Sequence, residues 1–105
     1  MVYIALRSIE RLGGGTGMFR MWGKLWKDNR LVDDTTVCIG DYSLSRTQMV
    51  FQALEELCYY FDLGKPIWLD ANVRDFQIHA KTRFRQDNFI EHIEFDFLEI
   101  QVIEE

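Results

Sequence analysis

Four side chains in this sequence could act as soft metal ligands or as a nucleophile and its base: Cys38, Cys58, His79 and His92. Structural zinc sites use close pairs such as C-x2–4-C, which place two ligands on one turn, and these four residues are widely separated. The sequence also lacks the local signatures of serine and cysteine hydrolases. Cys58 falls on the apolar stripe of an expected helix, where a free cysteine behaves as a small hydrophobic residue. We therefore expect neither a metal site nor a catalytic cysteine.

A second candidate chemistry comes from carboxylates. Asp33-Asp34 together with Glu99-x-Gln101 loosely resembles the strand-borne acids of metal-dependent nucleases, which hold Mg²⁺ and position the attacking water. Adjacent residues of a strand face opposite ways, so Asp33 and Asp34 cannot both bind one ion without a bulge. Charges that discourage aggregation of a sheet edge explain these acids better. A metal-dependent hydrolase is the weakest alternative, and we expect no catalytic activity.

The residues that point most clearly to binding lie in the stretch MFRMWGKLWK. Its alternation places Arg20, Trp22, Lys24 and Trp26 on one face of a strand and apolar residues on the other. Two exposed tryptophans beside basic residues are typical of an interface. The alternative is a sheet that is covered on both faces, which would place both indole rings in the core.

A second basic segment, KTRFR, adds Lys81, Arg83 and Arg85. Aromatic side chains interleaved with basic ones are also how single-strand nucleic-acid binders stack bases and follow phosphates. The formal net charge of −5 disfavours that alternative. The acidic residues that follow these cations could instead occupy a basic groove on another protein. We expect an interaction or accessory protein that binds a protein partner or a second copy of itself, with single-stranded nucleic acid as the alternative ligand.

Length and composition bound the class of protein. A chain of 105 residues suffices for one domain with a single core. Three Trp, four Tyr and eight Phe can make a small core self-sufficient without metals or disulfides. No apolar run approaches the roughly 20 residues of a membrane span, and two cysteines do not indicate a disulfide framework. We expect a soluble, cytosolic protein.

The N-terminal stretch RLGGGTGM raises the question of a phosphate-binding loop. It lacks the third glycine of the dinucleotide pattern and the ending of a Walker loop, and a strand rather than a helix is expected to follow. No cofactor is therefore expected. A linker fits the composition better, and Leu-Gly-Gly can be encoded by a purine-rich run that resembles a ribosome-binding site upstream of Met18. We interpret residues 1–17 as a leader, fusion or misassigned-start segment, with a short helix over residues 2–12 as the alternative.

The remaining residues, 18–105, are expected to form a single α+β domain. The turn pair Asp28-Asn29 favours a β-hairpin, since both residue types tolerate left-handed backbone angles. Together with a C-terminal strand this hairpin makes a small antiparallel sheet, on which two or three helices pack. The expected strands are residues 18–27, 31–39 and 94–104, with a bulge or phase change near Phe97-Leu98.

The clearest helix is expected over residues 46–62. Ser45 and Gln48 have the spacing of a capping box, in which each side chain satisfies a free backbone N–H of the other residue. Gly64 is the expected C-terminal cap, and the proline after it prevents continuation of the helix.

A second helix is expected from near residue 71, capped by Asp70. Its buried face would carry Val73, Phe76 and Ala80. The segment TRFRQDNF is expected to interrupt regular structure, with Asp87 or Asn88 capping one further helical turn.

Several phrases of the sequence, FRMWGKLWKDNRLV, GKPIWLD and RFRQDNFIE, resemble a short family of hypothetical proteins from clostridial-type Gram-positive bacteria. The resemblance covers residues 18–105, and members of that family begin near the position of Met18. It implies a cytosolic bacterial protein. No activity is established for the family, so the resemblance implies no functional residue.

Overall fold

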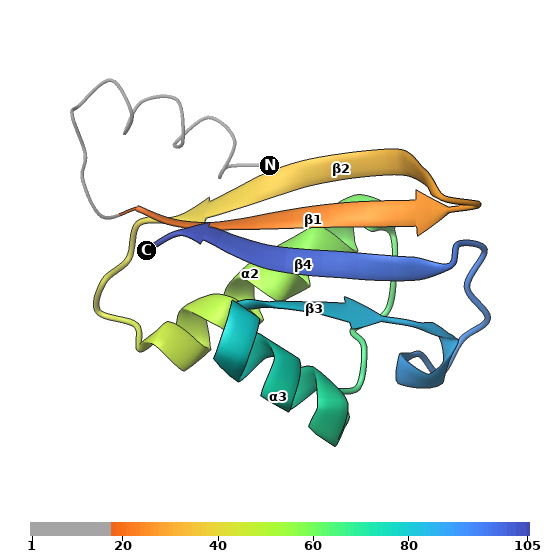
Figure 1. Ribbon diagram of the computed structural model, residues 1–105. Helices are drawn as coiled ribbons and strands as arrows, with labels where there is room; N and C mark the ends of the chain where they lie inside the picture. Colours follow the sequence, from red (N-terminus) through yellow and green to blue (C-terminus); the bar gives the residue numbers. More distant parts are fainter. Residues whose placement is uncertain (1–17) are drawn as a thin grey trace.

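The computed structural model describes residues 18–105, so the interpretation of the N-terminal segment as a leader lies outside the described residues. The fold is α+β: a four-stranded antiparallel sheet with two helices packed on one face (Figure 1). This confirms the predicted fold class and adds a strand to it. The strands are β1 Phe19–Lys27, β2 Arg30–Ile39, β3 Lys81–Phe84 and β4 Phe97–Glu104, and the helices are α2 Arg46–Phe61 and α3 Asp70–His79.

The strand order is β2-β1-β4-β3, so β2 and β3 are the edges of the sheet. The predicted hairpin of β1 and β2 is confirmed, and its turn residues Asp28 and Asn29 have φ angles of 54° and 63°. The register shifts where Leu25 faces Asp33 and Trp26 faces Leu31. Such a bulge twists an edge strand away from further pairing.

The core lies between the helices and the covered face of the sheet. Gly23 of β1 lies directly against Leu57 of α2, because a Cβ there would lie 2.7 Å from the Cδ2 atom of Leu57. The largest fully buried side chains come from both layers and are Phe19, Phe84, Met21, Ile39, Leu57, Leu98, Ile100 and Cys58. Within residues 18–105, neither helix combines the length and the apolar character that crossing a membrane requires.

Helix α2 begins as predicted and ends differently. Ser45 and Gln48 form the capping box, with Ser45 N–H donating to Gln48 Oε1 at 2.8 Å. The prediction of Gly64 as the C-terminal cap is wrong: Asp62 takes the left-handed conformation, with φ 58°. Asp is one of the few residue types that tolerate this region without a glycine. Gly64 instead donates its N–H to Glu91 Oε2 at 2.9 Å.

Helix α3 corrects two further expectations. Asp70 is the first helical residue rather than the cap, and the side chain that serves the helix start is Asn72, whose Oδ1 accepts the Leu69 N–H at 3.1 Å. Val73 is exposed, while Asn72 and Phe76 are the buried residues of this helix. A buried asparagine breaks the apolar pattern from which the buried face was predicted.

The segment predicted to interrupt regular structure is strand β3. Its inward side chains, Thr82 and Phe84, are buried, whereas the basic residues between them are exposed. Four residues with only one large apolar side chain give too little alternation to indicate a strand, so pairing with β4 decides its conformation. A short 3-10 turn, η1 Gln86–Asn88, follows.

Strand β4 also differs from its prediction, because it starts at Phe97 and shows no phase change at Phe97-Leu98. Phe97 faces Trp26 and Leu98 faces Leu25, which is ordinary alternation. The irregularity lies at the other end of the ladder, where the register shifts between Arg20 and Met21.

Candidate functional site

The face of the sheet opposite the helices, here called the open face, carries every binding residue predicted from the sequence. Among residues 18–105 no helix packs against this face, since α2 and α3 both lie on the other side (Figure 1). The alternative of a sheet covered on both faces is therefore not found in the described part of the chain. The predicted residues are Arg20, Trp22, Lys24 and Trp26 of β1, Lys81 and Arg83 of β3, and Arg85 just after β3.

Glu99 of β4 is the centre of the open face and was not predicted as a binding-site residue. Only 4% of it is exposed. Its Oε1 lies 3.2 Å from Lys24 Nζ and accepts a 3.2 Å hydrogen bond from Trp26 Nε1, and its Oε2 accepts a 3.2 Å bond from Arg83 Nε. Burial alone would raise the pKa of Glu99, but the hydrogen bonds from Lys24 and Arg83 outweigh it and lower that pKa below 4.5.

Lys24 is less accessible than its sequence pattern indicated. Only 8% of it is exposed, because its ammonium group lies over the Trp22 ring at 3.9 Å from the centroid and beside Glu99 and Gln101. A lysine in this position neutralises the buried carboxylate, and only a small part of its side chain is exposed. Lys24 therefore supports the face through Glu99, and its predicted contact with a partner stays a prediction.

The two tryptophans are half-buried, so they are neither free in solvent nor part of the core. Trp22 Nε1 donates to Asp34 Oδ2 at 2.8 Å, and the Trp26 ring lies 6.3 Å from the Phe97 ring between centroids. Indole N–H groups held by carboxylates fix both rings on the face. Their remaining exposed surface is consequently presented in one orientation.

The basic residues of β3 border the aromatic part of the open face. The guanidinium carbons of Arg83 and Arg85 lie 4.6 Å and 5.0 Å from the Phe97 ring centroid. Arg20, at the far end of β1, pairs with Glu104 with 2.6 Å between Nε and Oε1. Phe97 was missed as a site residue, although its alternation with Glu99 on one strand could have placed it there.

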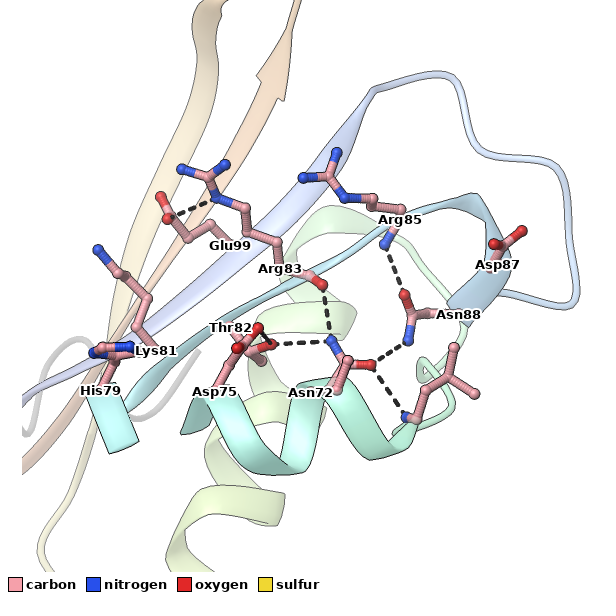
Figure 2. A pocket seen from close by; sticks show the side chains of 12 residues that line it. Asn72, Asp75, His79, Lys81, Thr82, Arg83, Arg85, Asp87, Asn88 and Glu99 are labelled. Atoms are coloured by element: carbon pink, nitrogen blue, oxygen red, sulfur yellow. Dashed lines mark hydrogen bonds and ion pairs between the residues drawn. The ribbon is translucent and has the colours of Figure 1, made fainter. Parts of the chain in front are cut away.

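A groove of about 490 Å³ lies between α3 and the outer edge of β3 (Figure 2). In Figure 2 the basic side chains Lys81, Arg83 and Arg85 stand along β3, and Asn72 and Asp75 of α3 lie across from them. The β3 wall of the groove is therefore mainly basic, although Glu99 and Asp87 also line the groove, and Asp75 adds an acid on the α3 wall. The residues that line it are Leu69, Ala71, Asn72, Asp75, His79, Lys81, Thr82, Arg83, Arg85, Asp87, Asn88 and Glu99.

Two buried asparagines fix the shape of this groove. Asn72 Nδ2 donates to both Thr82 Oγ1 and the Arg83 carbonyl at 2.9 Å, and its Oδ1 accepts a 2.7 Å bond from Asn88 Nδ2. The Oδ1 of Asn88 accepts the Arg85 N–H at 2.8 Å. Because two of these four bonds go to backbone groups and the other two join side chains of different elements, they hold α3, β3 and the 3-10 turn in one arrangement.

The side chains that could act as metal ligands do not form a cluster in the part of the chain that the structure describes. Among residues 18–105 there is no group of three His, Cys, Asp or Glu side chains that could hold a metal ion. The acids Asp34 and Glu99 face Lys24 from the two neighbouring strands, so a lysine occupies the position between them. Cys58 is buried, and burial raises the pKa of its thiol to about 12, which leaves it protonated and unreactive near neutral pH.

Fold and site together define a small α+β domain with an open sheet face of tryptophan, phenylalanine and basic side chains. No family model, curated protein or solved structure matches this chain. The functional interpretation consequently depends on the geometry of the face and of the groove beside it.

Proposed function

We propose that the protein is a non-catalytic interaction module that binds a protein partner through the open face of its sheet. The observation that carries this proposal is the grouping on one face of Trp22 and Trp26 with the cations of β3. Tryptophan and arginine are the residue types most enriched at interface hot spots. These residues come from two separate segments of the chain, and strand pairing brings both segments to one face, with Lys24 buried beneath it.

The supporting shell of the open face favours binding over catalysis. The central acids of this face have partners within residues 18–105: Glu99 contacts Lys24 and Arg83, and Asp34 accepts a bond from Trp22. Of these two acids, Glu99 is a poor metal ligand or base, because Lys24 and Arg83 neutralise its charge. Both acids are well suited to holding aromatic rings in place for a partner.

We include self-association in the proposal. The chain carries a net charge of −5, yet Lys81, Arg83 and Arg85 form a local basic cluster. The acidic residues after position 86 of a second copy complement that cluster in charge. The resemblance to clostridial proteins supports the bacterial cytosol as the setting.

The test is capture of partners by the tagged full chain from a lysate of the source organism, with and without nuclease. The Trp22→Ala/Trp26→Ala variant should keep its far-UV circular dichroism and lose the captured protein. Tyr59→Ala is the matched control, since Tyr59 is a 74% exposed aromatic on the helical side. A partner retained equally by the double variant would contradict the proposal.

Single-stranded nucleic acid is the second candidate, favoured by the stacking of Arg83 and Arg85 on Phe97. Captured material that disappears after nuclease treatment, with binding that weakens steeply as salt rises, would favour it. Sedimentation of the purified chain over a range of concentrations tests self-association separately. Concentration-dependent mass that the tryptophan variant abolishes would assign the open face to a homotypic interface.

A further inference from the structure

The outer edge of β3 borders the open face and forms a wall of the groove beside α3 (Figure 2). In an antiparallel ladder, alternate residues exchange both backbone bonds with the neighbouring strand. Val102 N–H donates to the Ala80 carbonyl at 2.9 Å, and Thr82 faces Ile100 two residues along. Every second residue from Ala80 onward therefore bonds to β4, and the residues between direct their N–H and C=O groups outward.

The outward-directed residues of β3 are Lys81 and Arg83. Asn72 occupies the Arg83 carbonyl with its 2.9 Å bond. Among residues 18–105, the N–H groups of Lys81 and Arg83 have no hydrogen-bond acceptor, and no strand pairs with this edge. A strand edge that presents donors into a groove is the arrangement to which an extended peptide adds as a further strand.

The basic side chains along the β3 edge determine which peptide sequences are favoured. Lys81, Arg83 and Arg85 are exposed and stand on the same side of the edge, because one residue separates each from the next. Side chains directly opposite on neighbouring strands are about 4.5–5.5 Å apart, and opposite charges there stabilise pairing. An added strand would thus be favoured by acidic residues at every second position.

The α3 wall of the groove determines which residue types fit at the remaining alternate positions of the peptide, where side chains point toward α3. Asn72, Asp75 and His79 line it, so side chains that point toward α3 meet polar and acidic groups. Small polar residues fit this wall, whereas acidic ones would be repelled by Asp75. The four residues of β3 span roughly 13 Å at about 3.3 Å per residue, which limits the pairing to about four residues of the ligand.

We propose that an extended acidic segment of the partner protein adds to β3 as a further strand of the sheet. Its acidic side chains, at alternate positions, face Lys81, Arg83 and Arg85, and its backbone accepts the outward N–H groups of β3. This inference rests on the proposed function, since it names the partner segment that meets the basic end of the open face.

The probe for this proposal is a blocked seven-residue peptide of alternating threonine and glutamate, titrated into the ¹⁵N-labelled full chain. We expect saturable shifts of the Lys81 and Arg83 amide signals. A peptide with lysine in place of glutamate, and one N-methylated at alternate amides, should each bind at least about tenfold more weakly. The first comparison tests charge, and the second tests backbone pairing.

Two variants of one residue separate the backbone contribution from the side chain. Arg83→Ala and Arg83→Pro both remove the guanidinium, but only the proline also removes the outward N–H. The Arg83→Pro variant should bind the peptide about tenfold more weakly than Arg83→Ala, with both amide spectra remaining dispersed. Lys81→Glu, at an exposed side chain, should weaken binding without any change in fold.

Equal affinities of the two Arg83 variants, or full binding of the N-methylated peptide, would overturn strand addition. Peptide-induced shifts confined to the Trp22 and Trp26 indole signals would overturn it too, while leaving the proposed function intact. Capture of a partner through the tryptophans, without any binding of the peptide, would likewise overturn strand addition and leave the proposed function intact. Binding of an oligothymidylate in place of the peptide would overturn both proposals.

Discussion

The indole N–H of Trp26 donates a 3.2 Å hydrogen bond to Glu99 Oε1 and thereby joins an aromatic ring of β1 to a buried carboxylate of β4. The same oxygen lies 3.2 Å from Lys24 Nζ. One acid therefore orients a tryptophan and neutralises a buried lysine. The open face consequently acts as a unit, and a change at its centre should be felt by all of its members.

Replacement Glu99→Gln tests this centre. At neutral pH it leaves Lys24 and Arg83 without their charge partner, and we expect a loss of about 2 kcal/mol in the free energy of unfolding, measured with urea. The acid Glu94 provides the control, because its side chain is 84% exposed where it pairs with His92, so Glu94→Gln should change little. Equal stability of Glu99→Gln and the unchanged chain would argue against a central role.

The difference in unfolding free energy between the unchanged chain and Glu99→Gln should depend on pH. Because folding lowers the pKa of Glu99 below 4.5, its ionised form stabilises the native state above the unfolded pKa. That contribution is lost as pH falls from 4.5 through the folded pKa. The difference in unfolding free energy between the unchanged chain and Glu99→Gln should therefore shrink below pH 4.5. A difference that grew on acidification would have the wrong sign.

Gly23→Ala tests the close approach of β1 to α2. The added Cβ would lie 2.7 Å from Leu57 Cδ2, and Leu57 is fully buried, so overpacking should cost about 1–2 kcal/mol of stability. In a Leu57→Ala background the methyl group enters the space that the leucine leaves. The double variant should accordingly be more stable than the sum of the single changes predicts, which thermal unfolding would measure.

Asn72→Ala tests the polar network beneath the groove. It removes the bonds to Thr82 and the Arg83 carbonyl and leaves buried polar groups unpaired, so we expect a loss of about 2–3 kcal/mol. Gln77→Ala, at an exposed position of the same helix, controls for helix propensity. Hydrogen exchange should accelerate around β3 in Asn72→Ala alone; uniform acceleration over the whole sheet would point to global destabilisation instead.

The cysteines give a probe of global unfolding. Both Cys38 and Cys58 are buried, and burial raises the pKa of the Cys58 thiol to about 12. Neither should react with a disulfide reagent at pH 8 until the chain unfolds, since the thiolate is the reactive species. Reaction rates in increasing urea should therefore follow the unfolded fraction. Rapid labelling of the native protein would mean that the described burial is incomplete in solution.

The sequence by itself determined the elements whose signals are local. The hairpin turn at Asp28-Asn29 and the capping box at Ser45 depend on residues close together in the chain, and both were predicted correctly. Alternation in β1 also predicted that Arg20, Trp22, Lys24 and Trp26 share a face. These inferences need no knowledge of what lies across from each residue.

Only the tertiary structure decided features that depend on distant partners. β3 is a strand because β4 pairs with it, and Asn72 is buried because Thr82 and Asn88 provide bonds for it. Pairing between β1, β4 and β3 likewise brings the two basic segments together around Glu99. Side-chain burial and cross-strand contacts are set by long-range register, which a single local pattern does not encode.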